Sequence, residues 1–142
     1  MNIDKEFVPY QPSLDMKEIG FNEPCVYYVD KDNESYIYNF ETHPDEFIEW
    51  CGVNVIPTPT FSQAFRWFRE KYKLEGLILP QSQGAVIDGE PIYFIAIISY
   101  ENELMKELFN STNQSDLLHY NPREEAELAC LIKLIEIVKN NK

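Results

Sequence analysis

The strongest helical pattern of the chain lies at residues 121–139, which read NPREEAELACLIKLIEIVK. Asn121 is suited to cap a helix, Pro122 to occupy its first position, and the acidic residues that follow suit the positive end of a helix. The pattern continues to Lys139, whose charge suits the negative end. We therefore predict a long C-terminal helix.

The apolar side chains of this helix cover more than half of its circumference; they are Ala126, Cys130, Leu131, Leu134, Ile135, Ile137 and Val138. So wide an apolar arc exceeds what a surface helix needs. Either the helix lies deep against a sheet of its own chain, which is the general rule for apolar stripes, or a second copy covers part of it. The second alternative predicts a homodimer through the C-terminal helix.

Two pairs of segments upstream have the aromatic and β-branched composition of strands. Residues 25–29 and 35–40 are separated by a polar turn, and residues 77–79 and 92–98 by a longer loop. These pairs predict two hairpins that build one antiparallel sheet. With helices packed mainly on one face of that sheet and the long C-terminal helix as its principal cover, the expected fold class is α+β. The chain is expected to form a single domain over residues 1–142.

Two of the shorter helices predicted from the sequence lie in the first third of the chain. One covers residues 13–19, with Ser13 as the capping residue and Gly20 as the left-handed stop. The other begins at Pro44 and ends before Gly52, with two acidic residues in its first turn.

Two further helices are predicted in the middle of the chain. Thr60 and Gln63 form a capping box, and aromatic residues then recur at helical spacing as far as Tyr72. Apolar residues at positions 104, 105, 108 and 109 predict a short helix after the strand at residues 92–98.

The chain is acidic, with 24 acidic and 12 basic side chains among 142 residues and a formal net charge of −12. Its 44% hydrophobic content is enough for a core, so intrinsic disorder is excluded. Direct nucleic-acid binding is not expected, because it depends on lysine and arginine that displace counterions from phosphates. Basic protein surfaces are attracted instead.

Neither a membrane segment nor an export signal is expected. The first ten residues lack the apolar stretch of a signal peptide, and the longest apolar run, residues 92–98, is far shorter than the roughly 20 residues that span a bilayer. The three cysteines, Cys25, Cys51 and Cys130, are odd in number and widely spaced, which fits reduced thiols. We therefore expect a cytoplasmic protein.

The motifs with catalytic or metal-binding potential are incomplete. The spacing of Gly84 and Gly89 is that of a phosphate loop, but Glu90 and Pro91 replace the required Lys-Ser/Thr pair. His43 lies near several acids without the spacing of a metal site. No serine nucleophile elbow or cysteine–histidine pair of known spacing occurs. We therefore predict no catalytic, cofactor-binding or metal-binding residue.

The segment 61–73 interleaves aromatic and basic side chains. The helical period places Trp67 off the main aromatic stripe, near Gln63 and Lys71, while Arg66 and Arg69 lie on the opposite flank. The indole is then either covered by another element, as tryptophan usually is, or an exposed anchor for a partner. In the second case the partner-binding residues are Trp67, Arg66, Arg69 and Lys71.

Three blocks of sequence resemble a family of small uncharacterised proteins encoded by phages and prophages of gut Bacteroidetes. They are the residues 124–139, the opening segments 7–10 and 16–25, and the middle block 63–72, QAFRWFREKY. Residues 30–58 and 78–118 depart from the family pattern. The resemblance implies a phage or prophage origin and brings no assigned activity.

The favoured functional hypothesis is a non-enzymatic accessory protein of a phage or prophage that binds a host or phage protein. One alternative is an acidic mimic of DNA that inhibits a host nucleic-acid-binding protein, which requires carboxylates spaced like phosphates along one exposed ridge. The other is a small enzyme whose site assembles around His43 or His119 and distant acids.

Overall fold

The computed structural model describes residues 6–30, 35–42, 55–80, 86–87, 90–101, 104–111 and 123–141. Contacts within the chain divide it into two compact units, Met1–Ala64 and Phe65–Lys142. Each unit is described by itself, and a single domain over residues 1–142 stays a prediction. The predicted helix that begins at Pro44 lies outside the described residues.

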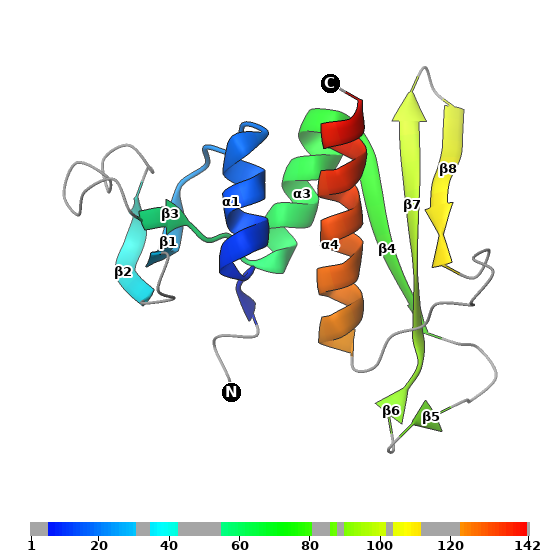
Figure 1. Cartoon of the computed structure of the whole chain (residues 1–142), viewed down its shortest axis with the longest axis horizontal. Coiled ribbons are helices and arrows are strands. Elements are labelled where there is room, and N and C mark those ends of the chain that lie inside the picture. Colours follow the sequence, from blue (N-terminus) through cyan, green and yellow to red (C-terminus); the bar gives the residue numbers. More distant parts are fainter. Residues whose placement is uncertain are drawn as a thin grey trace. The chain divides into compact units, whose positions relative to one another are not determined.

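The described residues of the first unit form a helix, a three-stranded antiparallel sheet and the start of α3 (Phe61–Tyr72) (Figure 1). The helix is α1 (Tyr10–Glu18), and the strands β1 (Cys25–Asp30), β2 (Ser35–Thr42) and β3 (Val55–Pro57) have the order β2-β1-β3. β1 and β2 form the first predicted hairpin, with an irregular register between Cys25 and Tyr27. β3, where the prolines predict only an extended connector, pairs with the other edge of β1.

The core of the first unit forms where α1 packs on this sheet. Tyr27, Val29 and Ile56 are buried, and Phe7, Tyr10 and Leu14 pack against them. The Phe7 and Tyr27 rings lie 4.3 Å apart between centroids. β-branched and aromatic side chains on one side of β1 therefore meet aromatic and aliphatic groups at the start of α1.

α1 begins three residues before the predicted start. Pro9 precedes its first residue, and Ser13 is not a cap: it lies inside the helix, buried, and its hydroxyl donates a hydrogen bond of 3.2 Å to the Val8 carbonyl. The predicted stop is confirmed, because Gly20 has a φ of 110°, which favours glycine over residues that carry a Cβ.

α3 (Phe61–Tyr72) has half of the predicted capping box. The Gln63 backbone amide donates to the Thr60 hydroxyl oxygen at 3.1 Å, which satisfies an open backbone N–H group of the first turn. The Gln63 side chain does not return to Thr60; its amide group donates to the Pro24 carbonyl at 3.0 Å and to a Glu23 carboxylate oxygen at 3.4 Å. The glutamine therefore ties the start of α3 to the segment before β1.

The second unit contains a three-stranded antiparallel sheet and a long helix. The strands β4 (Leu74–Pro80), β7 (Tyr93–Glu101) and β8 (Leu104–Asn110) have the order β4-β7-β8, and the helix is α4 (Arg123–Asn140). β5 (Val86–Ile87) and β6 (Glu90–Pro91) form a separate small pair. The second predicted hairpin corresponds to β4 and β7, and it lies in a different sheet from the first.

β8 corrects the predicted helix at residues 104–109. Its residues pair with β7, from Glu101 with Leu104 to Ala96 with Asn110. The register shifts between Ile97 and Ile98, so that Leu108 is an additional residue in β8. The hydrogen-bonding edge of an apolar central strand outweighs the weak helical propensity of seven residues.

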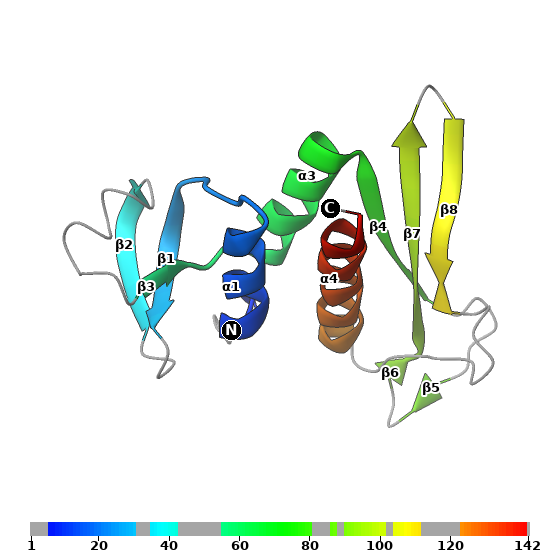
Figure 2. The ribbon, with the colours of Figure 1, turned by 45° about the horizontal axis from the view of Figure 1, so that its top comes forward.

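α4 confirms the predicted C-terminal helix and lies along one face of β4 and β7 (Figures 1 and 2). Its buried side chains are Ala126, Cys130, Leu131, Leu134, Ile135 and Val138. The wide apolar arc is therefore covered within one chain, which is the first of the two alternatives, although Ile132 is 48% exposed. The α+β class is confirmed, and a homodimer through α4 stays a prediction.

Among the described residues, no helix combines the length and the hydrophobicity that a bilayer-spanning segment requires.

Candidate functional site

The two faces of the β4-β7-β8 sheet are assigned from the contacts of β4 and β7. A Cβ atom built on Gly76 would lie 2.8 Å from the Cys130 sulfur of α4, so Gly76 faces α4. Its cross-strand partner Ile97 is fully buried on the same side. Because side chains alternate along a strand, the residues between these positions point to the opposite face, which we call the outer face.

The bulge in β8 changes this alternation. Leu108 lines a cavity beside α4, and the ring of the next residue, Phe109, lies 4.7 Å from the Lys133 ammonium of α4. Consecutive residues of a regular strand would point to opposite faces. The additional residue at position 108 therefore gives α4 two apolar neighbours from β8 in succession.

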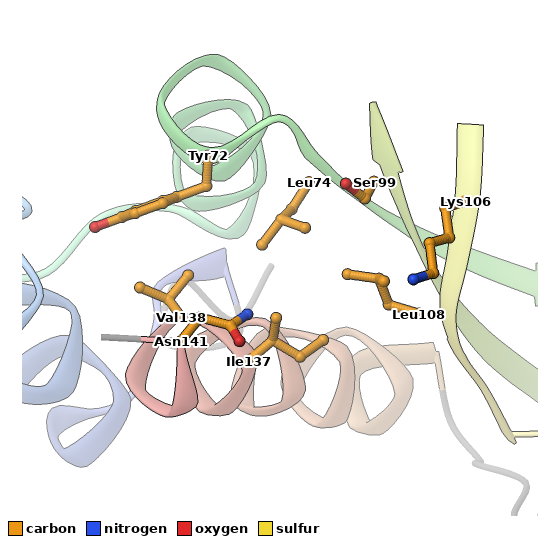
Figure 3. Close-up of a pocket in the computed structure, with 8 residues that line it drawn as sticks. All are labelled: Tyr72, Leu74, Ser99, Lys106, Leu108, Ile137, Val138 and Asn141. Carbon is orange, nitrogen blue, oxygen red and sulfur yellow. The ribbon is translucent and has the colours of Figure 1, made fainter. Parts of the chain in front are cut away.

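A cavity of about 530 Å³ lies between the C-terminal half of α4 and the sheet (Figure 3). It is lined by the end of α3 and by β4, β7, β8 and α4, through Tyr72, Leu74, Ser99, Lys106, Leu108, Ile137, Val138 and Asn141. This volume is within the range of roughly 300–1,000 Å³ that is typical of small-molecule sites.

The cavity has apolar walls and a few polar groups. Ser99 and Lys106 are cross-strand partners, so the sheet register brings a hydroxyl and an ammonium to the same side. Tyr72, on the α3 side, contributes a phenol whose pKa is raised by burial. Lys106 is the one charged group among the lining residues, and its ammonium points toward the space between β8 and α4 (Figure 3).

The outer face is apolar as well. Its members are Leu77, Leu79, Phe94, Ile98, Tyr100 and Met105, of which Met105 is 70% exposed and Leu79 and Tyr100 are also exposed. No described helix or strand of the second unit covers them (Figures 1 and 2). Two acids, Glu75 and Glu107, are the cross-strand neighbours of Ile98. The Glu75 carboxylate lies 3.6 Å from Arg69, and Glu107 accepts a hydrogen bond of 3.3 Å from Asn110.

Cys130 is a buried thiol between α4 and β4. Its pKa is raised from the ordinary value of 9.0 to about 12: burial is the main cause, a hydrogen bond from the Leu77 backbone opposes it, and the nearby Glu75 carboxylate adds to it. The thiolate is the nucleophilic form of cysteine, so Cys130 is inert at neutral pH. The cysteine is a core residue of the second unit.

The raised pKa of Cys130 predicts a loss of stability at alkaline pH. Between pH 9 and about 12 the unfolded chain loses the thiol proton while the folded chain keeps it. The unfolded state then binds fewer protons, so the free energy of unfolding falls as the pH rises through this range. Urea titrations of the wild type and Cys130→Ala at pH 8 and pH 10.5 measure the effect: the wild type should lose more stability than the variant. Equal losses would contradict it.

The predicted partner-binding residues of α3 differ in their exposure to solvent: Trp67 is buried, and the three basic residues are exposed. Trp67 is 5% exposed, and its ring lies 5.0 Å from Phe68 and 5.4 Å from Tyr72 between centroids. The indole is therefore covered, which is the first of the two alternatives, and partner binding through Trp67 stays a prediction. The Lys71 ammonium lies 5.1 Å from the centroid of the Trp67 ring, as the helical period predicts.

The two arginines of this set are surface groups. Arg66 is exposed, and Arg69 forms the ion pair with Glu75 described above. Their part in partner binding stays a prediction, without the central aromatic side chain on which the hypothesis was built.

The other motifs singled out in the sequence give no site in the described part of the chain. His43, Cys51, Gly84, Gly89 and His119 lie outside it. Within the described ranges, no group of three or more histidine, cysteine, aspartate or glutamate side chains is close enough to hold a metal ion.

Sequence reasoning missed both the cavity and the outer face. Lys106, Leu108 and Met105 belong to the segment predicted as a helix, so their partners in β7 could not be identified. The signal that pointed toward the outer face was the apolar run at residues 92–98, which indicated a central strand with apolar residues on both sides.

Comparisons of the chain with protein-family models, with curated protein sequences and with solved structures found no match.

Proposed function

We propose that the protein is a non-enzymatic binding module that recognises another protein through the outer face of the β4-β7-β8 sheet. The observation that supports this most directly is the exposure of Met105, opposite the exposed Tyr100, on a face that no described element of the second unit covers. Large exposed apolar patches on soluble proteins commonly mark interaction sites. Methionine suits such a site, because its flexible thioether adapts to different surfaces.

The charge of the chain favours a partner with an apolar centre and a basic rim. The formal net charge is −12, and Glu75 and Glu107 flank Ile98 on the outer face. A second copy placed face to face would bring the same acids and the same net charge against them, which costs electrostatic energy. A basic partner instead gains attraction and faster association. The proposed interface is therefore between two different proteins.

The proposed setting is the cytoplasm of a bacterium that carries the phage or prophage. The phage origin rests on the resemblance of the three sequence blocks. The cytoplasm is supported by Cys130, a buried thiol that is not part of a disulfide, because reducing compartments preserve such thiols.

DNA mimicry stays a prediction with less support. In α4, two of the acids are paired with basic side chains: Arg123 lies 3.5 Å from Glu127, and Lys133 lies 3.2 Å from Glu136. An uninterrupted ridge of carboxylates is what the hypothesis requires. The enzyme hypothesis around His43 or His119 concerns residues outside the described ranges.

Site-specific photocrosslinking tests the proposed interface. A photoreactive phenylalanine analogue at Met105 should yield a covalent adduct with a basic host or phage protein in cells. The matched control places the same analogue at Ile132, which is exposed on α4 and does not belong to the outer face. An adduct formed at position 105 and absent at position 132 supports the proposal, whereas the same adduct at both positions, or none at position 105, contradicts it.

Two variants that each introduce one carboxylate complete the test. Met105→Glu should abolish recovery of the crosslinked partner in a pull-down, while Ile132→Glu should leave recovery unchanged. Light scattering of the same two variants also tests the homodimer through α4, since only Ile132→Glu should dissociate such a dimer.

A further inference from the structure

The cavity beside α4 has a distribution of groups that the proposed protein-binding function does not use. Its lining comes entirely from the second unit, and it lies on the side of the sheet opposite to the outer face. In Figure 3, Leu74, Leu108 and Ile137 point into the space between the sheet and α4. A ligand with an aliphatic part can therefore contact three separate elements at once.

The polar groups of the cavity include one positive charge and no negative charge. Lys106 supplies an ammonium, and no carboxylate belongs to the eight lining residues. The charge of the lining is therefore positive, in a chain with twice as many acidic as basic side chains. Ser99, opposite Lys106 in the sheet, and Asn141, at the end of α4, add a hydroxyl and an amide that can donate hydrogen bonds to the same anion.

We propose that this cavity binds a small amphipathic anion, a carboxylate carried on a short unbranched aliphatic chain. The head group pairs with the Lys106 ammonium, and the tail lies against Leu74, Leu108, Ile137 and Val138. The cavity volume of about 530 Å³ accommodates a ligand of this size. Burial of the tail supplies most of the affinity, and the ion pair supplies the preference for an anion.

Calorimetric titration of the full chain with three ligands of eight carbon atoms each tests the charge preference. Octanoate should bind more tightly than octanol, and octanol more tightly than octylammonium. Shortening the carboxylate to hexanoate should weaken binding by up to about fourfold per methylene removed. Equal affinity for octanoate and octylammonium, or no binding of octanoate, would overturn the proposal.

Two substitutions separate the head-group contact from the tail contact. Lys106→Gln should weaken octanoate binding by up to about fivefold and leave octanol binding unchanged, because a partly hydrated ion pair contributes modestly. The matched control Lys133→Gln removes a positive charge from the same unit outside the cavity and should change neither affinity. Ile137→Ser should weaken both ligands. Equal octanoate affinity in the wild type and Lys106→Gln would refute the assigned head-group contact.

Discussion

Replacing Leu134 with alanine should lower the free energy of unfolding by about 2–5 kcal/mol. Leu134 lies in the middle of α4, is fully buried, and belongs to the face that packs on β4 and β7. The loss has two parts, the transfer free energy of the removed carbon atoms and the cost of the space that they leave. Since α4 packs against both β4 and β7 on one face of the sheet, the surrounding groups have little freedom to fill that space.

The matched control is Ile132→Ala on the same helix. Ile132 is 48% exposed, so its truncation should change stability by no more than about 0.5 kcal/mol. Both variants remove aliphatic carbons from α4 and both introduce alanine, so differences in helix propensity are small. Urea unfolding followed by tryptophan fluorescence is suitable, because Trp67 is buried in the second unit. Equal losses for the two variants would show that α4 does not pack as described.

The substitution Gly76→Ala should destabilise the second unit by about 1–3 kcal/mol. The added Cβ would lie 2.8 Å from the Cys130 sulfur and 3.0 Å from a ring carbon of Phe65. At an unhindered position the same change would stabilise the chain by about 0.4–1 kcal/mol, because alanine restricts the unfolded state. The sign of the effect therefore reports on the close approach of β4, α3 and α4.

A double-mutant cycle with Cys130→Ala identifies the crowding atom. Removal of the sulfur leaves room on the α4 side of Gly76, so Gly76→Ala should cost less in the Cys130→Ala background than in the wild type. Thermal unfolding of the four proteins measures the coupling. Additive effects would assign the crowding to Phe65 alone, and a stabilising Gly76→Ala in the wild type would contradict the packing.

Much of the local structure could be predicted because local signals and burial agree there. The sequence of α4 has a continuous apolar arc, and its observed bounds, Arg123–Asn140, match the prediction closely. The hydroxyl of Thr60 caps α3, and Gly20 terminates α1. In α1 and α3 the residues that define these ends also satisfy open backbone groups, so the sequence carries the information directly.

The segment that forms β8 could not be predicted for a specific physical reason. Its additional residue shifts the side-chain alternation, so that Leu108 and Phe109 face the same side. The apolar residues at positions 104, 105, 108 and 109 therefore have the spacing of one face of a helix. The correct structure depends on the free edge of β7, which is a non-local feature.

The candidate sites depend on the same non-local information. The helical period gives the direction of Trp67 on α3 but not what covers the ring. The cavity combines residues from α3, β4, β7, β8 and α4. Lys106 can be recognised as a lining residue only once the register of β7 and β8 places it opposite Ser99. No spacing motif exists for a site assembled in this way.

The bulge at Leu108 also bears on how molecules of this protein behave when they are concentrated. β8 is the outermost described strand of its sheet, and a regular, apolar outer strand is a template for fibril growth. The additional residue interrupts the regular strand pairing of β8, and the neighbouring Lys106 and Glu107 place opposite charges along the edge strand. Both features are recognised safeguards against aggregation, so the strand that supplies Met105 to the outer face is itself a poor seed for amyloid.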